Sequence, residues 1–286
     1  MLSFNSCGRC LACERGHPAY CDQLRQLNFS GNRADGSSGL SDVEGTPVRG
    51  HFFGQSSFAS FSLANERSVV KVPKDLPLAL LAPLGCGLQT GAASVLKALK
   101  VDTGASIVIF GVGSVGLAAI MASKIARAAT IIAVDVNEER LNLARELGAH
   151  HAIDARQADT AAAIRRIMPR GVDFALDTSG RKESLEAGLS ALAFQGKFGF
   201  VAFSPAAGAT LDASRLTPGQ SLQGIIQGDA VPQTFIPELI EFYRAGEFPI
   251  DKLVRRYASQ QINEAFADAA SGRAMKPVVV FDGQAA

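Results

Sequence analysis

The sequence predicts an α/β fold with a doubly wound parallel sheet, joined to a smaller region of short strands and loops. Strand and helix patterns alternate from Ser106 onward, which is typical of a parallel sheet with helical crossovers. A Gly-rich loop, Gly111-x-Gly113-x-x-Gly116, lies between an apolar run and a helical pattern. Residues 1–75, in contrast, are punctuated by Gly and Ser and contain only short apolar runs.

The elements follow from these patterns in chain order. The region before the sheet is expected to hold short strands such as 58–63, an irregular segment at 28–48, and helices at 78–84 and about 91–99. Continuous apolar and β-branched runs predict buried strands at 107–110, 130–135, 172–176, 197–203 and 222–226. Helices are expected at 115–126, at 138–147 with Gly148 as its end, and at 235–245, before a last apolar strand at 277–281.

Composition limits the classes of function. The chain has 286 residues, enough for one large or two ordinary domains, and its net charge of +1 without a basic cluster predicts no nucleic-acid partner and no anionic membrane. No apolar run is long enough to span a bilayer, and the first residues lack the features of a signal peptide. We therefore expect a cytoplasmic protein, in whose reducing environment cysteines more often bind metal than form structural disulfides.

Four cysteines near the start of the chain predict a structural zinc site. Their spacing, Cys7-x2-Cys10-x2-Cys13-x7-Cys21, supplies three thiolates from one tight loop and a fourth that closes a tetrahedron. Four thiolates leave no position open for water or substrate, so the site is structural and not catalytic. Disulfide pairing and an iron–sulfur cluster are the competing interpretations. His17 lies within this segment, and we expect it at the surface.

The Gly-rich loop predicts a dinucleotide site. Gly111 permits a tight turn, Gly113 lets the backbone approach a pyrophosphate, and Gly116 lets helix and strand pack closely. Val112 and Val115 lie between these glycines and belong to the same predicted cofactor-binding loop.

An acidic residue ends the strand that follows the loop. Asp135 is expected to bind the adenosine ribose hydroxyls and to repel a 2′-phosphate, which favours NAD over NADP. Arg140, five residues later, would soften that preference. The competing interpretation is that Asp135 only caps the following helix.

A fifth cysteine, Cys86, lies between Gly85 and Gly87. Lone cysteines are usually small buried hydrophobes, and this remains the competing interpretation. Glycines on both sides are unusual for core filling and indicate close approach of a ligand.

Together these motifs resemble the zinc-dependent alcohol dehydrogenases of the medium-chain dehydrogenase/reductase superfamily. The segment GCGLQTG at 85–91, with Gln227-Gly228-Asp229 later, is most similar to the aryl- or benzyl-alcohol dehydrogenase branch. The resemblance implies a Rossmann NAD-binding domain at 88–228. It also implies a GroES-like, β-rich catalytic domain at 1–87 and 229–286, with its zinc lobe at 7–21.

The resemblance assigns roles to further residues. Cys86 falls on a ligand of the catalytic zinc, and Thr90 on a residue that lines the nicotinamide site. Cofactor contacts are implied for Val201 and Phe203 at the nicotinamide amide and for Lys276 at the pyrophosphate.

Two adjacent aromatic residues complete the implied site. Phe52 and Phe53, next to His51, resemble substrate-pocket walls, although by type they would be ordinary core aromatics.

The chain departs from the family pattern before Cys7. Family members carry roughly 85 more residues there, a size estimated from ordinary domains. That segment holds a Cys and a His ligand of the catalytic zinc and a hydroxyl that relays the proton. Since Cys86 alone cannot hold that metal, we expect one zinc per chain, exposed apolar surface in the catalytic domain and little dehydrogenase activity. An in-frame extension upstream of Met1 that encodes a Cys and a Gly-His-Glu sequence would restore the enzyme.

Three functions stay open on these grounds. The first is an NAD-dependent zinc alcohol dehydrogenase that oxidises primary, aromatic alcohols to aldehydes. The second is a non-catalytic, zinc-stabilised NAD-binding protein for assembly or redox sensing. The third, a zinc-independent relative of the quinone reductases, is disfavoured by the four-cysteine lobe. Family members pair through the outer edge of the Rossmann sheet, here near 222–226, so a homodimer or homotetramer is expected.

Overall fold

The computed structural model describes residues 1–33, 35–55, 57–157, 159–201 and 216–281. The chain forms two compact units, which are Met1–Cys86 with Ala230–Ala286 (unit 1) and Gly87–Asp229 (unit 2). Each junction lies one residue from a domain boundary expected above. The functional names of those domains remain predictions.

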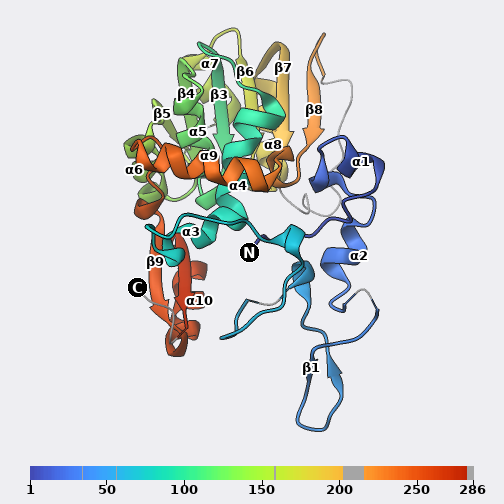
Figure 1. Ribbon diagram of the computed structural model, residues 1–286. Helices are drawn as coiled ribbons and strands as arrows, with labels where there is room; N and C mark the ends of the chain where they lie inside the picture. Colours follow the sequence, from blue (N-terminus) through green and yellow to red (C-terminus); the bar gives the residue numbers. More distant parts are fainter. Residues whose placement is uncertain (34, 56, 158, 202–215, 282–286) are drawn as a thin grey trace. The chain divides into compact units, whose positions relative to one another are not determined.

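Unit 2 is built on a six-stranded parallel sheet with the order β5-β4-β3-β6-β7-β8 (Figure 1). Its strands are β3 (Ser106–Phe110), β4 (Thr130–Asp135), β5 (His151–Asp154), β6 (Val172–Asp177), β7 (Leu192–Phe200) and β8 (Ser221–Gly224). The chain runs outward from β3 to β5, returns to β6 beside β3, and then runs outward the other way. This reversal makes the β3/β6 boundary a topological switch point, where such sheets bind ligands. The predicted doubly wound Rossmann sheet is confirmed.

The helices of unit 2 connect and cover these strands. They are α4 (Gly87–Ala93), the π-helical turn Ser94–Leu99, α5 (Ser114–Ile125), α6 (Glu138–Leu147), α7 (Thr160–Ile167) and α8 (Lys182–Ala191). Helix α4 approaches α5 so closely that a Cβ on Gly91 would lie 2.0 Å from the carbonyl oxygen of Val115. Glycine at this position therefore lets the two helices touch.

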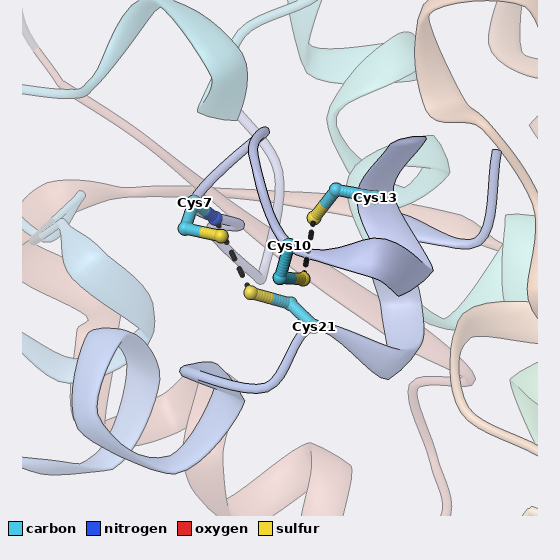
Figure 2. A group of neighbouring side chains, drawn as sticks. All are labelled: Cys7, Cys10, Cys13 and Cys21. Carbon is cyan, nitrogen blue, oxygen red and sulfur yellow. Dashed lines mark hydrogen bonds between the residues drawn. The ribbon is translucent and has the colours of Figure 1, made fainter. Parts of the chain in front are cut away.

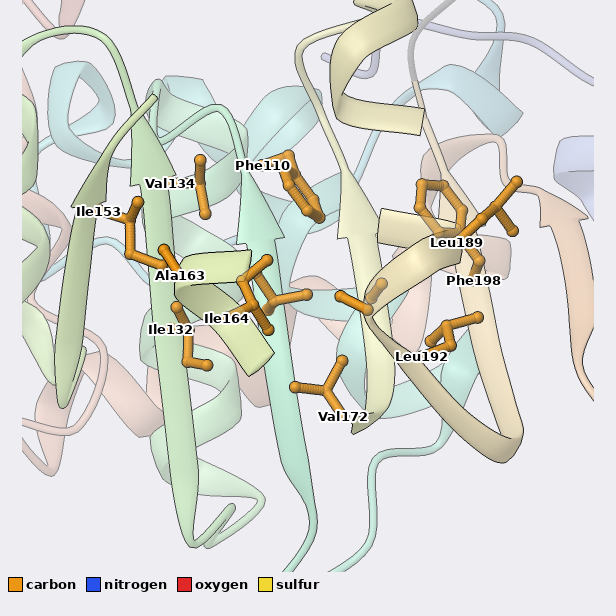
Figure 3. Close-up of a cluster of buried hydrophobic side chains, with 13 residues drawn as sticks. Phe110, Ile132, Val134, Ile153, Ala163, Ile164, Val172, Leu189, Leu192 and Phe198 are labelled. Atoms are coloured by element: carbon orange, nitrogen blue, oxygen red, sulfur yellow. The ribbon is translucent and has the colours of Figure 1, made fainter. Parts of the chain in front are cut away.

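One face of the sheet carries a continuous apolar core (Figure 3). Ala163 and Ile164 of α7 and Leu189 of α8 pack there against inward-facing strand residues such as Phe198. Gly188 fits this packing because a Cβ there would lie 2.2 Å from the ring of Phe198. Burial of each such aromatic side chain contributes roughly 2–3 kcal/mol. The core therefore fixes the strand ends from which the site is built.

Unit 1 contains little regular sheet among its described residues. Two strands of two residues each, β1 (Leu40–Ser41) and β2 (Pro47–Val48), pair antiparallel, and β9 (Val254–Ala258) pairs in parallel with β10 (Lys276–Val280). Its α-helices are α1 (Leu11–Glu14), α2 (Leu24–Phe29), α3 (Leu78–Leu81), α9 (Pro232–Arg244) and α10 (Ile262–Ser271). Short 3-10 turns connect several of these elements.

Some expected elements differ from the structure. The prediction of a strand at 58–63 is wrong. These residues form bends or irregular chain without inter-strand hydrogen bonds, and Phe58, Phe61 and Leu63 are all exposed. A strand is favoured where one of its two faces is buried, and this segment buries neither. The helix expected at about 91–99 begins earlier, at Gly87, and becomes π-helical from Ser94.

The end of the expected strand 197–203 also needs correction. Strand β7 starts at Leu192 and ends at Phe200, and residues 202 and 203 lie outside the described part. Among the described residues, no single helix is long and apolar enough to cross a membrane. A bent pair, Leu78–Gly85 with Gly87–Leu99, passes that test only in combination, by length and composition.

Candidate cofactor and metal sites

The four predicted zinc ligands converge in unit 1 (Figure 2). The Sγ atoms of Cys7, Cys10, Cys13 and Cys21 all lie within 4.8 Å of one another. Tetrahedral zinc with sulfur bonds of about 2.3 Å needs neighbouring sulfurs about 3.8 Å apart. Both the donor set and its spacing therefore fit such a metal. None of the four is in a disulfide, which removes that competing interpretation for the structure at hand.

Local hydrogen bonds prepare this cluster for anionic sulfur. The backbone N–H groups of Cys7 and Gln23 donate to Sγ of Cys21 at 3.3 and 3.4 Å. Burial nevertheless raises the pKa of the Cys21 thiol to about 12, whereas hydrogen bonds, first from the backbone of Asp22, lower the pKa of Cys10 to about 6. Holding all four sulfurs as thiolates at neutral pH therefore requires a cation among them.

A buried amide anchors the segment that carries Cys7. Asn28 on α2 is fully buried, and its Oδ1 accepts the N–H of Asn5 at 2.6 Å. Its Nδ2 donates to the carbonyl oxygens of Asn5 (3.0 Å) and Leu24 (2.8 Å). His17 is exposed, as expected, and is not part of the cluster.

The Gly-rich loop joins the carboxyl end of β3 to α5 in unit 2. Gly111 adopts a φ of +79°, and a Cβ there would lie 3.0 Å from side-chain atoms of Thr178 and Ser179. A Cβ on Gly116 would lie 2.0 Å from the carbonyl oxygen of Gly111, whereas one on Gly113 would meet nothing within 4 Å. Two glycines thus serve packing, and Gly113 presents bare backbone to open space.

Asp135 ends β4 beside this loop and is 8% exposed. Its Oδ2 accepts the N–H of Val112 at 2.7 Å, and its Oδ1 accepts those of Val136 (2.8 Å) and Asn137 (2.9 Å). The N-cap of α6 is Asn137, whose side chain accepts the N–H of Arg140. The competing interpretation of Asp135 as the helix cap is therefore wrong, because another residue fills that position.

A cavity of about 580 Å³ opens at these strand ends, entirely within unit 2. Gly111, Gly113, Val115, Asp135 and Arg140 line it, so five predicted cofactor residues share one cavity. Its bare Gly113 backbone and its carboxylate suit the pyrophosphate and ribose of a dinucleotide. The residues present therefore fit the adenosine diphosphate half of such a cofactor.

Several predicted site residues lie elsewhere. Val201 follows β7 and donates its N–H to the carbonyl oxygen of Asp177 at 3.0 Å, while Phe203 lies outside the described residues. On α4, Oγ1 of Thr90 lies 3.4 Å from Oε1 of Gln227. The same oxygen accepts a hydrogen bond from Nε2 of Gln89 at 3.0 Å. Neither Val201 nor Thr90 lines the unit 2 cavity.

Cys86 and Lys276 belong to unit 1, where both line a second cavity of about 680 Å³. Its lining is largely apolar and includes Phe58 and Phe266, which are 65% and 60% exposed. The exposed apolar surface expected in this region is thus present.

The aromatic pair predicted for the substrate pocket lies apart from this cavity. Phe52 and Phe53 pack against Phe29, with ring centroids 5.7 and 5.4 Å away, and do not line the cavity. Their pocket role remains a prediction.

Sequence reasoning missed several residues of the nucleotide cavity. Arg156 and Thr160 line it from the segment after β5, and Thr178, Ser179 and Arg181 from the segment after β6. Those after β5 were missed because β5 is short and polar. The residues after β6 could have been predicted, because ligands bind at the carboxyl ends of the two strands that flank the switch point.

A buried carboxylate supports the second of these segments. Asp177 ends β6 and is 3% exposed, and its Oδ1 accepts the N–H and the Oγ–H of Ser179 at 2.9 and 2.7 Å. Burial raises the pKa of Asp177, and these hydrogen bonds oppose that effect. Asp177 thereby positions Ser179 against Gly111.

Known proteins share this architecture. The zinc-binding dehydrogenase family profile matches residues 114–245. A geraniol dehydrogenase from Castellaniella defragrans is 44% identical over 98% of this chain and 76% of its own length. The crystal structure of an alcohol dehydrogenase zinc-binding domain protein from Burkholderia ambifaria is 48% identical, with a TM-score of 0.93 over 98% of this chain and 76% of that one. The crystal structure of benzyl alcohol dehydrogenase from Acinetobacter calcoaceticus is 44% identical, with a TM-score of 0.89 and the same coverage.

The chain belongs to the zinc-dependent alcohol dehydrogenases of the medium-chain dehydrogenase/reductase superfamily. It is accordingly an oxidoreductase of alcohols, and the predicted family is confirmed. The family explains why a four-cysteine lobe and a Rossmann sheet occur in one chain.

Proposed function

We propose that this alcohol dehydrogenase uses NAD and oxidises primary, aromatic alcohols to aldehydes in the cytoplasm. Asp135 carries the cofactor assignment. Its carboxylate lies on the wall of the nucleotide cavity, and three backbone N–H groups fix its position. That charge attracts ribose hydroxyls as hydrogen-bond donors and repels a 2′-phosphate.

The chemistry divides between bound groups and the chain. A bound catalytic zinc would polarise the alcohol oxygen, and the nicotinamide would accept the hydride. Such a zinc needs three protein ligands, so Cys86 alone does not complete its site. Cys86 is the residue of this chain proposed as a ligand of that metal, and Thr90 is proposed to line the nicotinamide site. The Gly-rich loop positions the pyrophosphate at the start of α5, with Lys276 proposed as a further contact, and the four-cysteine lobe holds a structural zinc.

The aromatic preference is supported by likeness to benzyl alcohol dehydrogenase at 44% identity. Geraniol dehydrogenase, at the same identity, supplies the competing substrate.

A direct assay tests these assignments. The zinc-loaded chain is incubated with benzyl alcohol or geraniol and with NAD or NADP, and aldehyde formation is followed. We expect NAD to be preferred and benzyl alcohol to be the better substrate, at the low rate expected above from Cys86 as a lone ligand of the catalytic zinc. Preference for NADP would overturn the cofactor assignment, and preference for geraniol would overturn the substrate. ADP binding without oxidation of either alcohol would support the second candidate, a zinc-stabilised nucleotide-binding protein.

A further inference from the structure

A second carboxylate lies next to the proposed ribose-binding acid. Strand β5 pairs with β4 so that Asp154 is the register partner of Asp135. The N–H of Ala155 donates to the carbonyl oxygen of Asp135 at 3.0 Å. Ala155 and Arg156 consequently line the nucleotide cavity beside Asp135.

Asp154 holds the side chain of Arg156 in a two-pronged pair. Nε of Arg156 donates to Oδ1 at 3.0 Å, and Nη2 donates to Oδ2 at 2.7 Å. The backbone N–H of Arg156 and Nε2 of Gln157 complete the shell, both at 2.9 Å. The Asp154 side chain is 9% exposed, whereas that of Arg156 is 58% exposed. Hydrogen bonds from the Arg156 side chain and backbone lower the pKa of Asp154 to about 2.

This pair decides which cations the cavity offers to a phosphate. A guanidinium group binds phosphate through two parallel N–H donors. In Arg156 both of these donors already bind Asp154. Arg140 also lines the cavity, and its buried Nε has no hydrogen-bond partner among the described residues. Arg181 lines the cavity from the segment after β6 and pairs with Glu183 at 3.4 Å. At the ends of β4 and β5, Arg156 is the second cation beside Arg140, and both prongs of its guanidinium are bound by Asp154.

We propose that Asp154 is a selectivity residue, which keeps Arg156 in a closed pair and so withholds this guanidinium from the 2′-phosphate of NADP. The inference rests on the proposed nucleotide site and goes beyond the repulsion attributed to Asp135. Asp154 disfavours the phosphorylated cofactor by pairing with the guanidinium of Arg156, whereas Asp135 disfavours it by direct charge repulsion.

The test is Asp154→Asn, with binding measured by calorimetry and no dependence on turnover. The introduced amide places an N–H group against a guanidinium donor, so the pair opens. The probes are ADP and adenosine 2′,5′-bisphosphate. We expect little change for ADP and about a tenfold gain for the bisphosphate, the size of one charge-assisted hydrogen bond. Adding Arg156→Ala should abolish the gain.

Glu139→Gln is the matched control. It removes the same charge from an exposed position of neighbouring helix α6 and should not produce the gain. Arg156→Ala in the unaltered background keeps the proposal falsifiable if Asp154→Asn does not fold. It should leave the ratio of the bisphosphate affinity to the ADP affinity unchanged, and a fall in that ratio would overturn the proposal.

The measurements distinguish failure of the nucleotide site from failure of the role of Asp154. If the unaltered chain binds no ADP, the nucleotide site itself is refuted. If it binds ADP but Asp154→Asn leaves the ratio of the two affinities unchanged, only the role of Asp154 is refuted.

Discussion

Gly113 and Gly116 are the same residue type in one loop, yet the structure needs them for different reasons. A side chain at Gly116 would collide with the backbone of Gly111, since the Cβ would lie 2.0 Å from its carbonyl oxygen. A side chain at Gly113 would enter open space, and its φ of −70° suits any residue. The fold therefore requires Gly116, whereas only a bound ligand requires Gly113.

Alanine at each position separates these roles. Gly116→Ala should lower the free energy of unfolding by about 1–3 kcal/mol, because strand and helix must move apart. Gly113→Ala should change stability by less than about 1 kcal/mol, because loss of a favourable N-cap residue is offset by the lower entropy of the unfolded chain. It should weaken ADP binding at least about tenfold, because the methyl group occupies the place of the pyrophosphate. Thermal unfolding and calorimetry measure both quantities. Equal stability losses in the two variants would contradict this division.

At the scale of elements, a buried network joins β9 to α10 in unit 1. The Asp268 side chain is 5% exposed and accepts the hydroxyl of Tyr257 at 2.7 Å. It also pairs with Arg273 at 2.6 Å and with Arg255 at 3.1 Å. Tyr257 and Ala265 also share a small apolar cluster with Ala274 and Val279, so polar bonds and apolar packing together hold the strand against the helix.

The network gives stability a defined pH dependence. Hydrogen bonds, first from Tyr257 and then from Arg273, lower the pKa of Asp268. Because the pKa of Asp268 is lower in the folded chain, its carboxylate stabilises the fold at pH values above the ordinary carboxyl pKa of about 3.9. This stabilisation is lost as the pH falls through the pKa of Asp268 in the folded chain. Asp268→Asn should therefore lower the melting temperature at pH 7, and the difference from the unaltered chain should shrink at acid pH. A difference independent of pH would contradict the ionic origin. Asp251→Asn on an exposed turn is the control.

The four-cysteine lobe is the second element whose stability is testable. Native mass spectrometry should find a structural zinc that Cys10→Ser or a strong chelator removes, because three thiolates hold zinc far less tightly than four. Metal loss should lower the melting temperature, since the lobe has few buried apolar residues. Cys86→Ser is the matched control and should leave this zinc in place. Iron in the purified protein would instead indicate the iron–sulfur interpretation.

How far the sequence predicts these elements depends on how local their signals are. Strand β4 and helix α6 have the bounds that were predicted for them. Their signals are local: a continuous β-branched run marks the strand, and Asn137 and Gly148 cap the two ends of the helix. Strand β5 was missed because His151 and Asp154 leave it only two apolar residues between them. Its pairing with β4 is a long-range contact, which no local pattern encodes. The Asp154–Arg156 pair is local in sequence, but its place beside Asp135 depends on the pairing of β5 with β4 and was missed with that strand. The loop glycines and Asp135 were predicted from their spacing.

For the whole molecule, the sheet edge is the feature that bears on assembly. Strand β8 is the last strand of the described sheet, and Ser221, Gln223 and Gly224 on it are exposed. The N–H of Ile225 donates to the carbonyl oxygen of Phe200 on β7 at 2.8 Å. Because backbone groups alternate in direction along a strand, those of Leu222 and Gly224 point away from β7, toward the open edge. An unpaired row of this kind is a template for pairing with a second copy.

We therefore expect a dimer in which two β8 strands pair antiparallel about a two-fold axis. The axis would pass near the middle of the strand, which brings the two Gln223 side chains close together. Gln223→Lys would place two like charges there and should weaken the dimer roughly tenfold or more. His151→Lys on β5, the opposite edge of the same sheet, adds the same charge and should leave the dimer intact. Sedimentation velocity over a concentration series measures both. A monomer in the unaltered chain, or equal effects of the two substitutions, would show that β8 is not the interface.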